Sequence, residues 1–174
     1  MFRLCRLQPL GNQMTEPITV HEALQRIAFQ PLLAIEMKVD QVYKFGGTGT
    51  SHQAGMVSVG RFQGERLQGE VLPGGSDWQT VLADGTILLD AKLPLRTDDG
   101  AHIIMKYQGV RSASPEVLAR MTAGETVDPG EYHFRINPTF FTSDPRYDWL
   151  NRVVAFGLGQ RLPVGPVYNV FELK

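Results

Sequence analysis

Hydrophobic and polar residues alternate along most of this chain, which is the pattern of β-strands that bury one face. The alternation is regular after Pro31, where Leu33, Ile35, Met37 and Val39 are separated by Ala34 and two charged residues. Further strand-like segments cover residues 53–62, 66–72, 132–141, 152–158 and 167–172. The pattern predicts a protein built mainly from short strands.

The clearest part of the pattern is a three-strand meander over residues 77–82, 86–96 and 101–111. Asp84-Gly85 separates the first two strands, and Asp98-Asp99-Gly100 separates the last two. Asp-Gly favours a hairpin, because both central residues of a two-residue type I′ turn need positive φ. With two-residue turns, counting outward places Asp77 opposite Lys92, and Lys92 opposite Tyr107.

Helix is expected only in short pieces. Ser114-Pro115 provides a cap and a first-turn proline, and Gly124 a stop, so residues 115–123 are predicted to be helical. Thr19 to Glu22 fits a capping box that opens a helix ending near Phe29. Asp144-Pro145 predicts one more helical turn. Eight or nine strands with one or two short helices favour an all-β antiparallel barrel or sandwich.

Length and composition narrow the organisation of the chain. The 174 residues suit one domain, so we expect an N-terminal extension over residues 1–30 and a single β-domain over residues 31–174. Lys plus Arg number 17 and Asp plus Glu 18, a balance that disfavours nucleic acid as a partner. The sequence shows neither a signal peptide nor an apolar run that could span a membrane, so a cytoplasmic protein without membrane contact is expected. Translation from Met14 stays an alternative to Met1.

Known cofactor and metal motifs do not fit. Cys5 is the single cysteine, and the four histidines lack the paired spacing of metal ligands. The segment from Gly157 to Leu162 begins like a dinucleotide fingerprint but has Leu162 in place of the third glycine. We therefore expect no cofactor and no metal.

The predicted register gathers polar residues on one face of the meander: Asp77, Gln79, Asp90, Lys92, Arg96, Tyr107 and Arg111. The opposite face is apolar and includes Trp78, Leu89 and Leu93. Two interpretations stay open. The polar face is either a solvated outer surface, whose ion pairs contribute under ~1 kcal/mol each, or the lining of a barrel cavity. Arginine outnumbers lysine by 12 to 5, and its fork suits carboxylate or phosphate groups.

A second strand can add to this polar set. His133 and Arg135 alternate with apolar neighbours and join the set if their strand closes a barrel. Trp78 and Trp149 are either buried anchors or surfaces on which a ligand stacks.

Several blocks resemble a known family. Gly74-Gly75-Ser76-Asp77-Trp78-Gln79, Leu89-Asp90-Ala91, the run from Leu95 to Ala101, and the run from Asp144 to Asn151 are similar to the domain-of-unknown-function 3237 family, also called uncharacterised protein family 0311. The likeness runs from about Pro31 to Leu173. It implies a small β-barrel of the allene oxide cyclase type that encloses a small molecule, and it supplies no established reaction.

These observations together lead to one functional hypothesis. The chain is expected to be an antiparallel β-barrel that binds a small organic molecule with an anionic or carbonyl group, and to catalyse a cofactor-independent isomerisation, cyclisation or lyase step. Arg96 and Arg111 would hold the anion, Asp90 or Asp77 would transfer protons, and Tyr107 would donate a hydrogen bond. The remaining ligand-binding residues would be Gln79, Lys92, Trp78, His133 and Arg135. The alternative is a non-catalytic carrier or an assembly module that forms a homo-oligomer.

Overall fold

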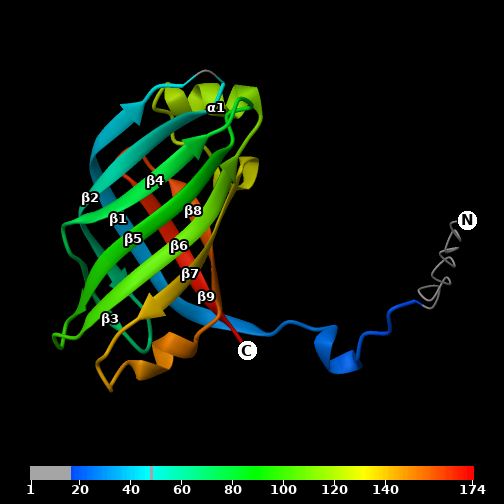
Figure 1. Cartoon of the computed structure of the whole chain (residues 1–174), viewed down its shortest axis with the longest axis vertical. Coiled ribbons are helices and arrows are strands. Elements are labelled where there is room, and N and C mark those ends of the chain that lie inside the picture. The colour runs from blue at the N-terminus through cyan, green and yellow to red at the C-terminus, as the bar shows by residue number, and fades with distance from the viewer. Residues whose placement is uncertain (1–16, 48) are drawn as a thin grey trace, which may run out of the picture.

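The computed structural model describes residues 17–47 and 49–174, and in these the chain is mostly sheet. Nine strands follow one another: β1 (Phe29–Phe45), β2 (Ser51–Gln63), β3 (Gln68–Val71), β4 (Gly75–Val81), β5 (Ile87–Thr97), β6 (His102–Ser112), β7 (His133–Phe141), β8 (Ala155–Arg161) and β9 (Pro166–Leu173). Figure 1 shows them wound around a common axis. The prediction of an antiparallel β-barrel with eight or nine strands is confirmed.

The barrel closes with eight strand positions, because β3 and β4 share one of them. Both strands lie between β2 and β5, with β3 paired to residues 60–63 of β2 and β4 to residues 51–57. Pro73 and Gly74 lie in the turn that separates them. The sheet closes on itself because β1 pairs in antiparallel fashion with both β2 and β9. In the described part of the chain, the inner face of the sheet is therefore buried by the barrel itself and needs no second layer.

The meander has the three strands that its pattern predicts, but the predicted register is wrong by one residue in both hairpins. Asp77 pairs with Ala91, and Ala91 pairs with Tyr107. Each loop has three residues, because only its glycine takes positive φ: +83° at Gly85 and +90° at Gly100. Such loops combine a type I turn with a left-handed glycine, whereas a two-residue type I′ turn needs two residues at positive φ.

Four short helical segments complete the fold. Helix α1 (Pro115–Thr122) confirms the prediction, and the Ser114 hydroxyl accepts a hydrogen bond from the Val117 amide at its start. The predicted N-terminal helix is reduced to the 3₁₀ turn η1 (Glu22–Leu24), capped by His21, and β1 already begins at Phe29. The 3₁₀ turn η2 (Pro129–Glu131) precedes β7, and the 3₁₀ turn η3 (Asp148–Arg152) follows it.

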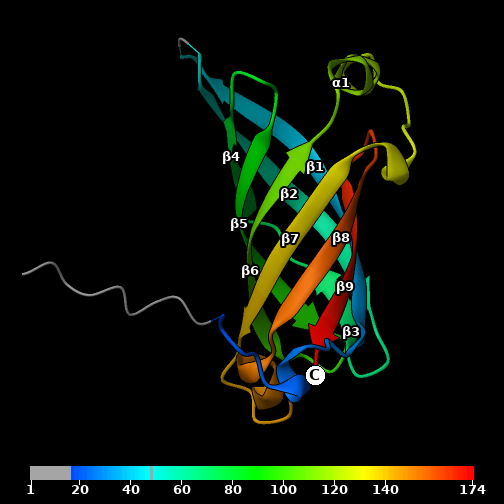
Figure 2. The same ribbon diagram turned by 90° about the vertical axis from the view of Figure 1, so that its right-hand side faces the viewer.

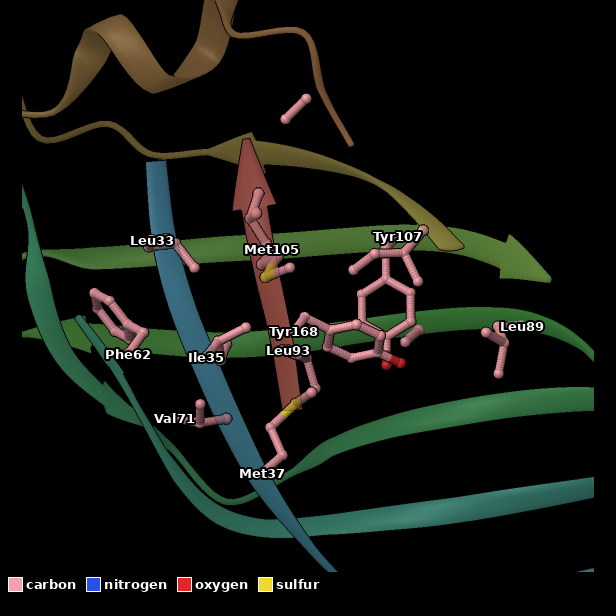
Figure 3. Packing of buried hydrophobic residues seen from close by; sticks show 14 of the residues in the cluster. Leu33, Ile35, Met37, Phe62, Val71, Leu89, Leu93, Met105, Tyr107 and Tyr168 are labelled. Carbon is pink, nitrogen blue, oxygen red and sulfur yellow. The ribbon is translucent and has the colours of Figure 1, made fainter. Parts of the chain in front are cut away.

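The two ends of the barrel differ. Helix α1 lies beside one end, and η3, in the orange segment, lies at the other (Figures 1 and 2). The half nearer η3 is filled by apolar side chains such as Phe62, Leu33 and Met105, and the fully buried Leu150 of η3 packs against this core. Figure 3 follows the core towards Tyr107, Tyr168 and Leu89. Open space inside the barrel is found beyond these residues, towards α1.

A polar network fastens the chain ends at the η3 end of the barrel. Glu172 of β9 accepts hydrogen bonds from Gln30 (3.1 Å), Lys174 (2.9 Å) and Arg66. The Arg66 guanidinium also lies 3.9 Å from the ring centre of Trp149. The network therefore links the first strand, the last strand and the β2–β3 loop. The Arg66 side chain of this network packs on the ring of Trp149.

Some expectations fall outside the described residues, namely those concerning Met1, Cys5 and Met14. Within residues 17–47 and 49–174, no helix has the length and apolar character needed to cross a membrane.

Candidate functional site

The candidate site is the polar lining of the barrel on the α1 side. It begins with inward-facing residues of β4 and β6, which the alternation along each strand places on the same side as the core. Asp77 is 6% exposed and Tyr107 is 3% exposed. Gln79 and Arg111, two and four positions further along their strands, point into the same space. The structure thus brings together four of the residues that the sequence suggested.

A chain of side-chain hydrogen bonds orients the carboxylate. Gln53 of β2 donates from Nε2 to Gln79 Oε1 at 2.5 Å, and Gln79 Nε2 donates to Asp77 Oδ2 at 2.7 Å. Asp77 Oδ1 is buried and has no hydrogen-bond partner within the described residues. Burial raises the pKa of Asp77 above its usual value, although the hydrogen bond from Gln79 opposes this shift. Asp77 therefore has one oxygen held by Gln79 and one buried oxygen without a hydrogen-bond partner in the described chain.

Two tyrosines form the floor of the cavity. The rings of Tyr107 and Tyr168 lie edge to face with centroids 5.5 Å apart, and their hydroxyl groups lie next to each other in Figure 3. Burial is the main reason why the pKa of Tyr107 lies well above its normal value, and the same cause raises the pKa of Tyr168. Both phenols therefore stay protonated and able to donate hydrogen bonds at neutral pH.

Two arginines line the barrel near α1, on strands β6 and β8, which lie on either side of β7. Arg111 ends the inward row of β6, with its guanidinium 5.6 Å from the ring centre of Phe134, and Arg161 ends the inward row of β8. Arg111 Nε and Arg161 Nη1 are buried and have no hydrogen-bond acceptor in the described part of the chain. Burial, and then the charge of Arg161, lowers the pKa of Arg111. Both guanidinium groups stay positively charged, because arginine keeps its proton at any physiological pH.

These residues surround a cavity of about 90 Å³. Its other walls are apolar and come from β1, β2, β5 and β7, including Met37, Val57, Leu89 and Phe134. The charged residues that line it are Asp77, Arg111 and Arg161, so the lining has an excess of one positive charge when Asp77 is ionised and two when it is protonated. A buried excess of positive charge is costly unless an anion neutralises it.

Six of the predicted site residues lie on the outer surface instead. The register shift turns Asp90, Lys92 and Arg96 of β5 outward, where Arg96 pairs with Glu70. Trp78 is 56% exposed and stacks on Phe45 with centroids 5.9 Å apart. The last two, His133 and Arg135, are exposed on β7. None of the six lines the cavity.

Three polar residues of the lining were not predicted from the sequence: Gln53, Arg161 and Tyr168. A signal for Arg161 was present, because Gly157, Gly159 and Arg161 alternate along β8 and share its inner face. A methyl group on Gly159 would lie 2.7 Å from the Phe134 ring and 2.8 Å from the Tyr168 ring. The glycine therefore makes room for two large inward-facing rings, which is a packing role.

Metal ligands do not gather in the part of the chain that the structure describes: no three His, Cys, Asp or Glu side chains lie together there in a suitable arrangement.

Fold and site together define a class: a closed antiparallel β-barrel with a small internal cavity lined by one carboxylate, two arginines and two tyrosines. Comparison with known proteins agrees with this class. The family model described as "Protein of unknown function (DUF3237)" matches residues 27–173. The chain belongs to this family.

Similar proteins extend over nearly the same region. A UPF0311 protein of Clostridium acetobutylicum is 30% identical over 153 residues, which cover 87% of this chain and 97% of that protein. The crystal structure of a conserved protein of unknown function from Rhodopseudomonas palustris has a TM-score of 0.81 at 30% identity, with coverage of 86% and 98%. A β-barrel-like protein from Acinetobacter baumannii has a TM-score of 0.75 at 35% identity, with coverage of 86% and 97%.

Proposed function

We propose that this protein binds a small organic anion at the cavity, with the negative group on Arg111 and Arg161. The observation that carries the proposal is the pair of buried guanidinium nitrogens without acceptors, set against a single carboxylate. A carboxylate or an enolate on the ligand would supply the missing acceptor atoms and balance the charge. Apart from two glutamines and two tyrosines, the rest of the wall is apolar, which suits the carbon skeleton of an organic molecule better than an inorganic ion.

The proposed chemistry is proton transfer next to a carbonyl group, without a cofactor. Asp77 would take a proton from the carbon beside the carbonyl and return it elsewhere, which is the shared step of many isomerisations, cyclisations and eliminations. Its raised pKa favours this role, because a general base works best with a pKa near the working pH. Tyr107, Tyr168 and the arginines would stabilise the enolate by hydrogen bonds and charge.

Anion binding is tested by calorimetric titration with benzoate. Arg111→Met and Arg161→Met should each lower the affinity at least tenfold, while Arg135→Met on the outer face of β7 should leave it unchanged. Equal affinity in all three variants and the natural protein would refute the proposed anion site.

Proton transfer is tested separately with phenylpyruvate in deuterated water. The protein should accelerate exchange of the protons next to the keto group, followed by nuclear magnetic resonance. Asp77→Asn should abolish the acceleration and Asp90→Asn, on the neighbouring strand but outside the barrel, should retain it. Benzoate binding without any exchange would leave the protein as a carrier. Exchange that survives Asp77→Asn would refute the role of Asp77 as the base.

The assembly-module alternative has one observation in its favour. Phe29, Phe156 and Phe171 pack together on the outer face of β1, β9 and β8, with centroids 5.4–5.8 Å apart, and Phe29 is 57% exposed. Native mass spectrometry of the natural protein and of Phe29→Ser would detect an oligomer that depends on this cluster.

A further inference from the structure

A second, larger space adjoins the cavity. A cleft of about 490 Å³ lies between α1 and the end of the barrel, in the region where Figures 1 and 2 show the helix beside the strand ends. Its walls come from the β4–β5 hairpin, from α1 and from the loop between β8 and β9. Helix α1 stands close to the hairpin, since a methyl group on Gly85 would lie 2.5 Å from Leu118 Cδ1.

The cleft and the cavity share Arg111 and Arg161. The guanidinium groups thus stand on the boundary between the two spaces. The remaining charged residue on the cleft wall is Glu125, and its carboxylate is paired with Arg120 at 3.1 Å. Positive charge is therefore concentrated at the inner end of the cleft.

The rest of the cleft is mostly apolar. Val81 and Ile87 line it from the hairpin, Leu118 and Met121 from α1, and Leu162 from the β8–β9 loop. Leu118, Met121 and Leu162 are only partly buried, so each keeps some apolar surface available for contact, although Met121 also packs against the core. A surface of this kind gains free energy when an apolar group covers it, at roughly 25 cal/mol per Å².

We infer that the cleft is a second subsite that takes the apolar body of the ligand, and that the ligand is an extended aromatic or alicyclic monocarboxylic acid. This inference rests on the proposed function, because it places the carboxylate on Arg111 and Arg161. A second negative charge at the far end of the ligand would meet apolar side chains and no free cation in the described cleft. The same feature disfavours diacids, sugar phosphates and nucleotides.

The test compares three acids by calorimetric titration: benzoate, biphenyl-4-carboxylate and biphenyl-4,4′-dicarboxylate. The natural protein should bind the biphenyl monoacid at least tenfold more tightly than benzoate, and the diacid more weakly than the monoacid. Met121→Trp, which fills the cleft from α1, should lower the affinity for the biphenyl monoacid at least tenfold and change that for benzoate less than twofold. Ala119→Trp, on the exposed face of the same helix, should change neither.

Leu162→Trp, from the opposite wall, provides a second variant if Met121→Trp does not fold. The two proposals fail in different ways. Benzoate binding that requires Arg111, combined with no gain for the biphenyl acid, would overturn the subsite and keep the anion site. If neither acid requires Arg111 for binding, the proposed function is overturned, and with it the placement of the ligand in the cleft.

Discussion

Gly159 offers a direct test of how tightly the wall of the site is packed. An alanine methyl group there would lie 2.7 Å from two ring carbons of Phe134 and 2.8 Å from Cε1 of Tyr168. Carbon atoms in proteins are not found this close without a covalent link, because their favourable separation is about 3.5–4.0 Å. Both rings are almost fully buried, at 2% and 1% exposure, and their centroids are 5.1 Å apart. Neither ring can move away without displacing the other.

The expected cost follows from this overpacking. Extra atoms in a well-packed core cost about 1–3 kcal/mol, and for a chain of this length each kcal/mol lowers Tm by about 2–4 °C. Gly159→Ala should therefore unfold roughly 4–8 °C below the natural protein if the cost is about 2 kcal/mol. Since Tyr168 must shift, its hydroxyl moves relative to Asp77 and the arginines, and benzoate should bind several-fold more weakly.

Thermal and urea unfolding measured side by side provide the assay. Gly46→Ala is the control, because nothing lies within 4 Å of the added methyl group; its Tm should stay within about 2 °C of the natural value. Gly157→Ala should fall between the two, because its methyl group comes closer than 3.0 Å only to the aliphatic Ile136. A Gly159→Ala protein that is as stable as the Gly46→Ala control would show that the rings adapt, and would refute the packing argument.

Three further predictions concern the two ends of the barrel. Glu172→Gln should lower stability by about 1–2 kcal/mol at pH 7. Burial raises the pKa of Glu172, but its hydrogen-bonding partners together hold that pKa below 4.5. The difference in stability between the two proteins should therefore vanish as the pH falls through the lowered pKa of Glu172. The Asp144 carboxyl should titrate with a pKa of about 2 because of hydrogen bonds from Arg146, and Arg146→Ala should return its midpoint, seen by carbon-13 resonance, towards 3.8. Ser114→Ala removes the cap of α1 and should cost about 1 kcal/mol in urea unfolding, and the loosened helix should weaken binding of biphenyl-4-carboxylate more than that of benzoate.

The sequence was sufficient for the architecture because the alternation, the Asp-Gly turns and the Ser114-Pro115 helix start are all local signals. It was insufficient for the register, because loop length depends on which residues take positive φ, and Asp-Gly is compatible with both the two-residue and the three-residue loop. Arg161 and Tyr168 come from strands that meet β6 only through the closed barrel. No local pattern connects residues 111, 161 and 168, so their proximity could be seen only in three dimensions.

The error in register had unequal consequences along the meander. Both hairpins are shifted by one residue in the same sense, so the two shifts cancel between β4 and β6. Asp77 and Tyr107 therefore do share a face, as they would with two-residue turns, whereas every residue of β5 changes sides. The apolar row from Ile87 to Leu95 takes the inner position in place of Asp90, Lys92 and Arg96.

This exchange changes the electrostatic character of the site. With the β5 charges inside, Asp77 and Arg111 would have additional neighbours of opposite charge, which favour the charged form of each group. With the apolar row of β5 inside, the charged groups of the described lining are only Asp77, Arg111 and Arg161, which are partly or fully buried among uncharged side chains. Charges in such surroundings interact strongly because little water screens them, which is why the pKa of Asp77 is raised and that of Arg111 lowered by burial first of all. The same scarcity of compensating charge makes an entering anion the strongest available partner for the two arginines.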